Sequence, residues 1–315
     1  MATLFLLPSL RYGGAAADAR RMVLDRADSG KTHVAVLGET GPWEAELRQA
    51  GAPVHRLDWA RAFDPGAVWA LVRLLREVDA TEVHCFERGP LRLLGLCGGN
   101  VLARTVAHRI RADEPLGRVD RWLLERVHRV VARTEWEASV LRKQGAPAAR
   151  LSVVPFTPAA PMPRRAAAPF IVCVARLEHR HGPRDAVWAM DMLAYACADL
   201  ELRLIGVGSL APALERLQAS VHFAGRTRFV PASADMRPVL QEAQACWITA
   251  RPGHGLQVAL EAQACDCPLV AYDQPALREL IAPGEKASFV PPGDMMALAR
   301  TTFGLLRQDL ARRAA

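Results

Sequence analysis

The sequence lacks any apolar run that approaches the roughly 20 residues a helix needs to cross a bilayer. Its longest apolar runs are residues 3–10 and 268–272. The first has no basic region before it and no small-residue cleavage site after it, so we expect it to form a first strand rather than a signal peptide. We therefore expect a cytoplasmic protein without a membrane-spanning segment.

Aromatic residues and cysteines are also scarce. The three tyrosines and nine phenylalanines are too few for a basic stripe interleaved with aromatic side chains, so we do not expect nucleic acid as a partner. The seven cysteines are an odd number, and most lie in apolar segments, so we expect them to be reduced. Cys265 and Cys267 form one close pair, but no second Cys or His pair at zinc-site spacing accompanies them, so no metal site is expected.

Acidic residues are outnumbered by basic ones. Lysine plus arginine exceed aspartate plus glutamate by 40 − 33 = 7, and the excess suits a phosphorylated or anionic partner without choosing among such partners. Two interpretations stay open for the densest basic stretch: peripheral contact with an anionic membrane at its inner face, or a solvated helix face with its loops. That stretch contains Arg104, Arg109, Arg111, Arg118 and Arg121.

Short runs rich in valine, isoleucine and leucine alternate with segments of helical periodicity. This pattern predicts an α/β protein whose parallel sheets carry helices on both faces, and 315 residues suit two domains of roughly 150 residues each. The expected strands are residues 3–7, 33–37, 54–57, 82–86, 104–108 and 129–133 in the first half, and 170–175, 200–206, 221–225, 245–250, 268–272 and 287–290 in the second.

A proline-rich segment separates the two halves, since prolines disfavour both helices and central strands. We therefore expect two Rossmann-like domains with a cleft between them. The predicted boundaries are residues 1–155 for the N-terminal domain, 156–169 for the linker, and 170–315 for the C-terminal domain.

Ligands of open parallel sheets bind beyond the carboxyl ends of the strands, and two places in the first half have suitable residues there. Gly13 and Gly14 follow the first strand, where backbone amides at a helix start can approach a phosphate or sugar, although a glycine pair also fits a plain tight turn. His108 ends the fifth strand, where an imidazole is suited to hydrogen-bond a substrate hydroxyl or to transfer a proton. His84, on the neighbouring strand, is expected to be structural.

In the second half, Arg176 directly follows the first strand and offers a rigid fork of donors to a diphosphate. Arg180 or His181 would supply a second cation beside it. Surface arginines in a loop are the alternative interpretation. Gly206, in a Gly-Val-Gly segment after the next strand, is a weak phosphate-loop signal because the third glycine of a dinucleotide fingerprint is missing.

A Gly-Xaa-Gly turn that feeds a helix follows the strand at 245–250. Such a turn makes a nest for an anion, and Glu261, further along that helix, can accept hydrogen bonds from ribose hydroxyls. A glutamate flanked by apolar residues also needs a polar partner. The turn and helix start consist of Gly253, His254, Gly255 and Leu256.

Taken in order, these segments resemble the retaining family-4 glycosyltransferases, which have the GT-B fold. The resemblance covers most of the chain and is densest from residue 170 to 294. Its motifs are residues 174–177, like the family's Gly-Arg-Leu, then 204–208, 221–225, 255–264 with 267–270, 277–281 and 291–294. The first half matches more loosely, at residues 13–14, 51–57, 108 and 153–155.

The resemblance implies two Rossmann-like domains with a deep interdomain cleft. The N-terminal domain would bind the acceptor, and the C-terminal domain would bind the nucleotide sugar. It implies transfer of a sugar, with retention of configuration, from a nucleoside diphosphate sugar to a glycan, lipid or small-molecule acceptor, without a metal or other cofactor. Arg176, helped by Arg180 or His181, would stabilise the departing diphosphate, Glu261 would fix the ribose, and His108 would orient the reacting sugar or acceptor hydroxyl. Further donor contacts are expected at Gly13, Gly14, Gly206, Gly225, Gly253, His254, Gly255 and Leu256.

Three positions depart from the family pattern. Gly253 stands where the family has the first of two glutamates, which grips the donor sugar; His181 replaces a lysine; and Phe156 replaces an asparagine. A permanent charge at position 181 thus becomes one that titrates near neutrality, and Arg180 or His254 would have to substitute. Gly253 and His181 favour the alternative, a degenerate GT-B protein that binds nucleotide or partners an active transferase without turnover. An epimerase of the same fold is a third candidate.

Overall fold

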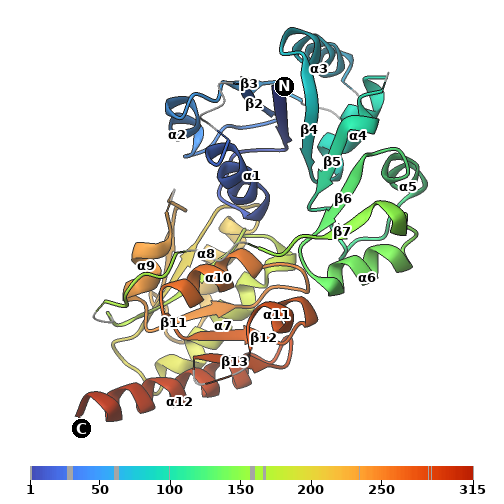
Figure 1. Cartoon of the computed structure of the whole chain (residues 1–315). Coiled ribbons are helices and arrows are strands. Elements are labelled where there is room, and N and C mark those ends of the chain that lie inside the picture. Colours follow the sequence, from blue (N-terminus) through green and yellow to red (C-terminus); the bar gives the residue numbers. More distant parts are fainter. Residues whose placement is uncertain are drawn as a thin grey trace. The chain divides into compact units, whose positions relative to one another are not determined.

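The computed structural model of the chain describes residues 2–26, 31–59, 64–98, 100–156, 160–165, 168–233, 235–282, 284 and 286–314, the last six by their backbone alone. The chain divides into two compact units, Met1–Phe156 and Thr157–Ala315. Each unit is built on its own parallel sheet (Figure 1).

The N-terminal unit contains a seven-stranded sheet in the order β3-β2-β1-β4-β5-β6-β7. The strand order reverses its direction between β1 and β4, which is the topological switch point where such sheets bind ligands. The strands are β1 (Ala2–Leu7), β2 (Thr32–Val36), β3 (Val54–Arg56), β4 (Ala80–Phe86), β5 (Thr105–His108), β6 (Arg129–Ala132) and β7 (Leu151–Val153).

Helices cover both faces of this sheet because side chains alternate along its central strand. Phe5 and Leu7 of β1 pack with residues of α1 and α2, whereas Leu4 and Leu6 pack with residues of α3 and α4. Local sequence fixes the helix starts, as at α3, where the Asp64 carboxylate accepts hydrogen bonds from two backbone amides. The helices are α1 (Gly14–Leu24), α2 (Glu44–Gln49), α3 (Pro65–Glu77), α4 (Arg88–Leu96), α5 (Arg118–Leu124) and α6 (Glu135–Lys143), with 3-10 turns η2 (Leu102–Arg104) and η3 (Ala148–Arg150).

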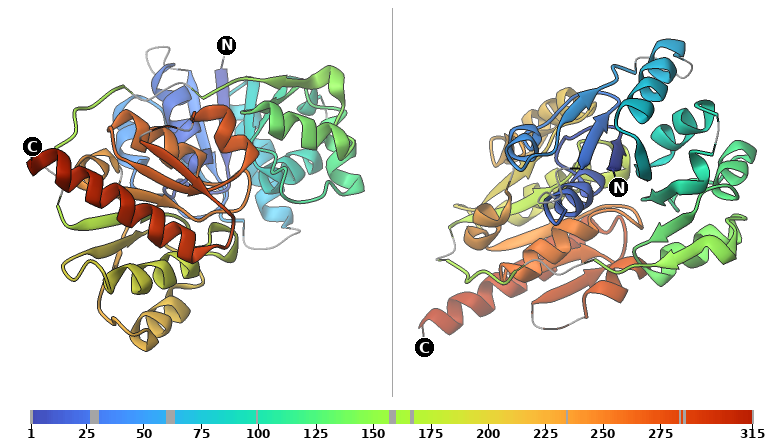
Figure 2. Two further views of the ribbon diagram at one scale, coloured as in Figure 1. Left: turned by 90° about the horizontal axis from the view of Figure 1, so that it is seen from below. Right: turned by 45° about the horizontal axis from the view of Figure 1, so that its top comes forward.

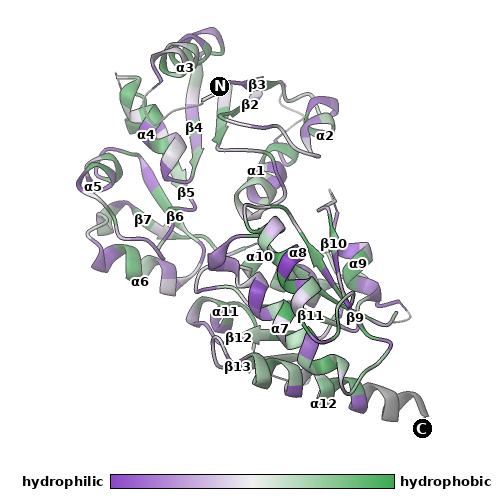
Figure 3. Ribbon diagram, turned by 180° about the vertical axis from the view of Figure 1, so that it is seen from behind, coloured by the Kyte–Doolittle hydropathy of each residue, from purple (hydrophilic) through white to green (hydrophobic). Residues whose placement is uncertain are grey.

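The C-terminal unit contains a six-stranded parallel sheet in the order β10-β9-β8-β11-β12-β13. Apolar residues dominate its strands (Figure 3). The strands are β8 (Phe170–Val174), β9 (Glu201–Ile205), β10 (Thr227–Val230), β11 (Ala245–Ile248), β12 (Leu269–Tyr272) and β13 (Ala287–Val290).

The helices of this unit again lie on both faces of the sheet. The long α12 packs against α7 (Figure 2), and the buried Trp247 of β11 donates its indole N–H to Thr302 of α12 at 2.8 Å. The elements are α7 (Pro183–Ala194), α8 (Ala211–Ser220), α9 (Arg237–Glu242), α10 (Leu256–Ala264), α11 (Pro275–Leu280), α12 (Met295–Ala314) and the 3-10 turn η4 (His179–His181).

The predicted α/β class with two Rossmann-like sheets is confirmed, but one predicted strand is wrong. Residues 221–225 form a turn, in which the Phe223 amide donates to the Asp191 carboxylate at 2.6 Å and Gly225 has a φ of 89°. The strand begins two residues later, as β10. The short strand β7 was not predicted, because its three residues run directly into the proline-rich segment.

The predicted linker is described only in part, since residues 157–159 and 166–167 lie outside the described residues. Its middle belongs to the C-terminal unit, where the Met162 amide donates to the Ala264 carbonyl at 2.8 Å and the Gln241 side chain donates to the Pro163 carbonyl at 2.6 Å. Within the described ranges, no helix combines the length and the apolar character needed to span a bilayer.

Candidate functional site

In the C-terminal unit, two of the predicted cations lie in the loop after β8, in different electrostatic settings. The Arg180 guanidinium donates to the Glu178 carboxylate, with nitrogen–oxygen distances of 2.8 and 2.7 Å. Arg176 is half-buried, and no carboxylate of the described residues forms an ion pair with it. The charge of Arg176 is therefore not balanced by a carboxylate of the described residues, whereas Glu178 already neutralises Arg180.

The loop after β8 is joined to the loop after β11 by backbone contacts. The Arg251 amide donates to the Arg180 carbonyl at 2.8 Å, and the Thr249 hydroxyl donates to the His181 carbonyl at 3.1 Å. Gly182 permits this approach, because a Cβ there would lie 2.1 Å from the Thr249 carbonyl oxygen. The two loops consequently form one structural unit at the carboxyl edge of the sheet.

His181 and His254 face each other across these joined loops. Their ring centroids are 4.8 Å apart, and the planes meet at 63°. The sequence named both residues as candidates to replace the family's lysine, and the structure brings them together. A pair of imidazoles at this edge offers ring nitrogens that can hydrogen-bond a ligand.

Gln274, which sequence analysis missed, holds the loop that contains Gly253 and His254. Its side-chain oxygen accepts from the Gly253 amide at 2.8 Å, and its side-chain nitrogen donates to the His254 carbonyl at 3.2 Å. Gln274 is only 1% exposed and follows β12 after one residue. Its position just after a strand could have identified Gln274 from the sequence, since polar side chains at the carboxyl edge of a parallel sheet are candidates for a functional site.

The glycines of this loop have backbone conformations that favour glycine. Gly253 and Gly255 have φ values of 85° and 77°, in the region where side chains with a Cβ are strained. Gly255 is also the N-cap of α10, and a Cβ there would lie 2.6 Å from Ile248. The first turn of α10 contains no acidic residue, so the positive end of this helix is available to an anion.

Glu261 and Leu256 both lie on α10 but in different surroundings. Glu261 is half-buried and accepts a hydrogen bond from the Gln257 side chain at 2.9 Å, one turn away. The polar partner that its position requires is therefore supplied within the helix. The Leu256 side chain is buried in the core, so it is not exposed to a ligand.

Gly206 and Gly225 differ from the other predicted donor residues. A Cβ on Gly206 would lie 1.9 Å from the Ala175 carbonyl oxygen, so close packing between the loops after β8 and β9 accounts for this glycine without a ligand. Gly225 precedes β10 and thus lies at the amino edge of the parallel sheet, opposite the loops described above. The structure does not bring Gly225 together with Arg176.

In the N-terminal unit, the side chain of Arg109 lies against the predicted glycine loop of Gly13 and Gly14. A Cβ on Gly14 would lie 1.7 Å from an Nη atom of Arg109, so glycine at this position makes room for Arg109 at the start of α1. Arg109 and Arg133 lie 3.2 and 3.1 Å from the same oxygen of the buried Asp18. Both guanidinium groups also lie over the Phe156 ring, 5.2 and 5.4 Å from its centroid.

This buried ionic cluster was not predicted from the sequence. Burial is the main cause that lowers the pKa of Arg133 and raises the pKa of Glu137. The Glu137 carboxylate accepts from the Arg133 amide at 2.6 Å, and Arg133 donates to the Val154 carbonyl at 3.2 Å. The cluster thus ties the end of β6 to the segment after β7.

His108 ends β5 as the sequence predicts, but its ring is only 4% exposed. It stacks on Phe86 at 4.7 Å, and its Nε2 lies 2.8 Å from Nδ1 of His84. Burial lowers the pKa of His108 well below its ordinary value and lowers the pKa of His84 to about 4. Both rings are therefore neutral near pH 7, and one must donate to the other.

Metal ligands do not gather in the described part of the chain. There, no group of three or more His, Cys, Asp or Glu side chains is placed to hold an ion. Cys265 and Cys267 are free thiols, and burial raises the pKa of each.

Two family models match the chain, one for each unit. Residues 13–157 match the glycosyl transferase 4-like domain, and residues 168–308 match the glycosyl transferases group 1. The chain belongs to the group 1 glycosyltransferases.

Among curated relatives of this glycosyltransferase is a GDP-mannose-dependent monoacylated alpha-(1-6)-phosphatidylinositol monomannoside mannosyltransferase from Corynebacterium glutamicum. It is 32% identical over 180 residues, which are 51% of this chain and 46% of the relative. The match thus spans about half the length of that protein.

Solved structures confirm the GT-B fold. HepE (Alr3699) of Anabaena, in complex with UDP and glucose, superposes with a TM-score of 0.77 at 17% identity and covers 97% of this chain and 90% of its own. WaaG, a glycosyltransferase involved in lipopolysaccharide biosynthesis, has a TM-score of 0.74 at 14% identity and covers 99% and 92%. Sucrose-phosphate synthase of Thermosynechococcus elongatus has a TM-score of 0.76 at 17% identity and covers 98% and 90%.

Proposed function

We propose that the protein transfers a sugar from a nucleoside diphosphate sugar to an acceptor, with retention of configuration and without a metal ion. The observation that carries this proposal is the convergence of Arg176, the His181–His254 pair and the positive end of α10 at one edge of the C-terminal sheet. These groups are all suited to an anion with the charge of a diphosphate.

In this proposal, Arg176 stabilises the diphosphate as it departs, because negative charge develops there in the transition state. The second cation is the His181–His254 pair rather than Arg180, since Glu178 already neutralises Arg180. Glu261 accepts from the ribose hydroxyls, and the backbone amides of the loop before α10 hold the phosphates. Uridine and guanosine diphosphate sugars are the donors to test first, given the UDP bound by HepE and the GDP-mannose named for the mannosyltransferase.

The N-terminal unit has the acceptor role, and its His108 is a hydrogen-bonding group rather than a permanent cation. Its Nε2 is occupied by His84, so Nδ1, which has no hydrogen-bond partner among the described residues, is the atom left for a hydroxyl. The acceptor is a glycan, a lipid or a small molecule. Cytoplasmic location, peripheral association with an anionic membrane and the absence of a nucleic-acid partner belong to the same proposal.

The second candidate is a degenerate GT-B protein that binds nucleotide or a partner enzyme without turnover. Gly253 favours it, because the backbone at this position has a φ of 85° and so disfavours the glutamate that grips the donor sugar in the family.

Calorimetric titration with uridine, guanosine and adenosine diphosphates, followed by an assay of donor hydrolysis, tests these candidates. We expect one diphosphate to bind and its sugar ester to be hydrolysed slowly without acceptor. Binding without hydrolysis or transfer would favour the degenerate protein. A chain that binds none of the three diphosphates would contradict the transferase proposal.

A further inference from the structure

Helix α5 of the N-terminal unit exposes apolar side chains next to basic ones. Val119 is 61% exposed and Trp122 is 46% exposed, and Arg118 and Arg121 are exposed beside them. The opposite side of α5 is buried through Leu123 and Leu124. A solvated helix would carry polar residues on its outer face, so this outer face suits a partner that is both apolar and anionic.

The neighbouring helix α4 extends this apolar and basic surface. Leu96 at its end is 49% exposed. Gly95 lets the two helices approach closely, because a Cβ there would lie 2.4 Å from Leu123. Beside Trp122 the surface is hollowed by a cavity of about 400 Å³, whose lining includes Leu94 and Leu102. We call Leu96, Arg118, Val119, Arg121 and Trp122 the α4–α5 surface.

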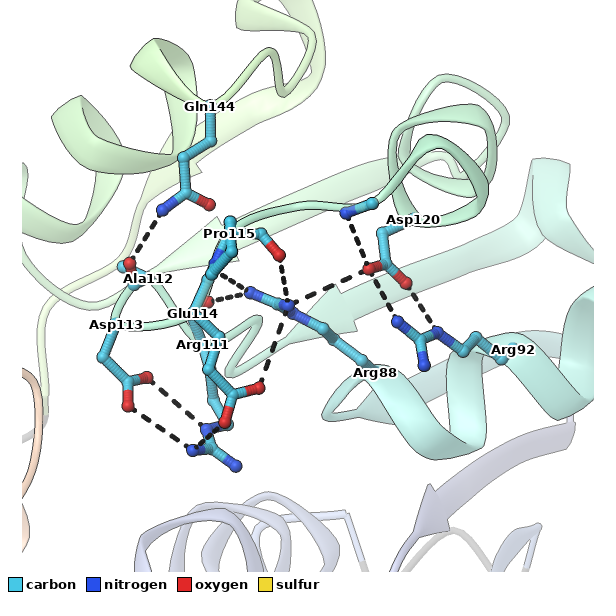
Figure 4. A network of polar contacts seen from close by, with 10 residues as sticks. Arg88, Arg92, Arg111, Ala112, Asp113, Glu114, Pro115, Asp120 and Gln144 are labelled. Carbon is cyan, nitrogen blue, oxygen red and sulfur yellow. Dashed lines mark hydrogen bonds and ion pairs between the residues drawn. The ribbon is translucent and has the colours of Figure 1, made fainter. Parts of the chain in front are cut away.

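A polar network beneath holds this surface in shape (Figure 4). Asp120 of α5 accepts two hydrogen bonds from Arg92 of α4, at 2.7 and 2.8 Å, and one from the Gly117 amide at 3.2 Å. Arg88 of α4 donates to the Pro115 carbonyl at 3.0 Å and also to the carbonyls of Arg111 and Glu114. The α4–α5 surface is therefore preorganised, which lowers the entropy cost of binding.

Some arginines of the basic stretch form ion pairs in the structure, and others do not. Arg109 pairs with Asp18, and Arg111 pairs with Asp113 and Glu114, so neither supplies an uncompensated charge. Arg118 and Arg121 have no ion pair with any carboxylate in the described part of the chain. The uncompensated positive charge thus coincides with the exposed tryptophan.

We propose that the α4–α5 surface docks on an anionic lipid bilayer, with Trp122 and Val119 at the headgroup level and Arg118 and Arg121 against the lipid phosphates. Tryptophan favours the membrane interface because one end of its ring is apolar and the other polar, and arginines attract an anionic surface. This inference deepens the peripheral association in the proposed function and rests on that function for its biological use. A lipid-linked acceptor would then be met at the membrane.

Co-sedimentation of the full chain with vesicles tests this docking surface. The vesicles contain phosphatidylcholine alone or phosphatidylcholine with phosphatidylglycerol, and we expect binding to the second kind alone. R118Q/R121Q should bind about 30-fold more weakly, which corresponds to about 1 kcal/mol for each arginine near an anionic surface. W122S should also weaken binding, and higher salt should weaken the parent more than R118Q/R121Q.

The matched control is Trp69→Ser on α3, because Trp69 is 65% exposed and Arg73 lies over its ring, as Arg126 lies over the ring of Trp122. It should bind vesicles like the parent. Equal vesicle binding by the parent, R118Q/R121Q and W122S would overturn the proposal, as would a change in oligomeric state in place of a change in lipid binding. Diphosphate titration of the same variants distinguishes the two proposals. Variants that lose the docking surface should bind nucleotide like the parent. Failure of the parent to bind any diphosphate would contradict only the proposed function.

Discussion

Nδ1 of His84 on β4 lies 2.8 Å from Nε2 of His108 on β5, and both residues are buried. The Glu82 carboxylate is 3.3 Å from the other nitrogen of His84. His84 therefore occupies one ring nitrogen of His108, which the sequence singled out, and Nδ1 is the nitrogen to which we assign the proposed hydrogen bond with a hydroxyl.

We expect this histidine pair to make the N-terminal unit sensitive to acid. Burial lowers the pKa of His84 from 6.5 to about 4, so the unfolded chain binds its proton more readily than the folded one. Stability should fall as the pH drops below 6.5 and should continue to fall until about pH 4. Urea unfolding across this range should show a smaller pH dependence for His84→Phe than for the parent. The exposed His128→Gln should behave like the parent, and an unchanged slope for His84→Phe would show that the pair does not cause the acid sensitivity.

Gln274 provides a second prediction, about the loop before α10. In Gln274→Ala, the Gly253 amide and the His254 carbonyl lose their partners, and leaving a buried polar group unsatisfied costs about 1–3 kcal/mol. We expect diphosphate affinity to fall about tenfold or more by calorimetry, since tenfold corresponds to about 1.4 kcal/mol. Gln274→Glu keeps an acceptor for the Gly253 amide and should recover part of the affinity. Gln263→Ala, at an exposed position on α10, is the control. A Gln274→Ala protein with parental affinity would show that the two hydrogen bonds from Gln274 are not needed for diphosphate binding.

Gly253 provides a third prediction. Gly253→Glu returns the family's glutamate but places a side chain at a φ of 85°, which costs about 1–2 kcal/mol for a residue other than glycine. We expect Gly253→Glu to lower the free energy of unfolding and to leave donor hydrolysis no faster than in the parent. Gly253→Asn, which tolerates this backbone conformation better, should be less destabilised. Faster hydrolysis by Gly253→Glu would mean that the loop can adopt the family's conformation after all.

Periodicity alone predicted the two parallel sheets, because buried strands leave apolar runs that helices separate. It misplaced β10, since Val221 and Phe223 look like strand residues, and only the contact of Phe223 with Asp191 places them in a turn. The position of Arg176 after β8 followed from the same pattern.

Several side-chain contacts could not be predicted. Glu178 neutralises Arg180 within one loop, and a spacing of two residues does not by itself show that the two side chains meet. Arg109 lies where a Gly14 side chain would be, 109 − 14 = 95 positions away, and Gln274 reaches back 274 − 253 = 21 positions to Gly253. These two contacts depend on segments that the fold of each unit brings together. The roles assigned to Arg176, Glu261 and His108 remain predictions.

The rate of donor hydrolysis or transfer by Arg176→Ala tests the transferase proposal most directly. Removing a donor that stabilises developing negative charge lowers kcat by about 100- to 1,000-fold, and we expect a loss of this size with the preferred nucleoside diphosphate sugar. Arg216→Ala, which removes an exposed arginine from α8, should keep the parental rate. An Arg176→Ala protein as active as the parent would contradict the account.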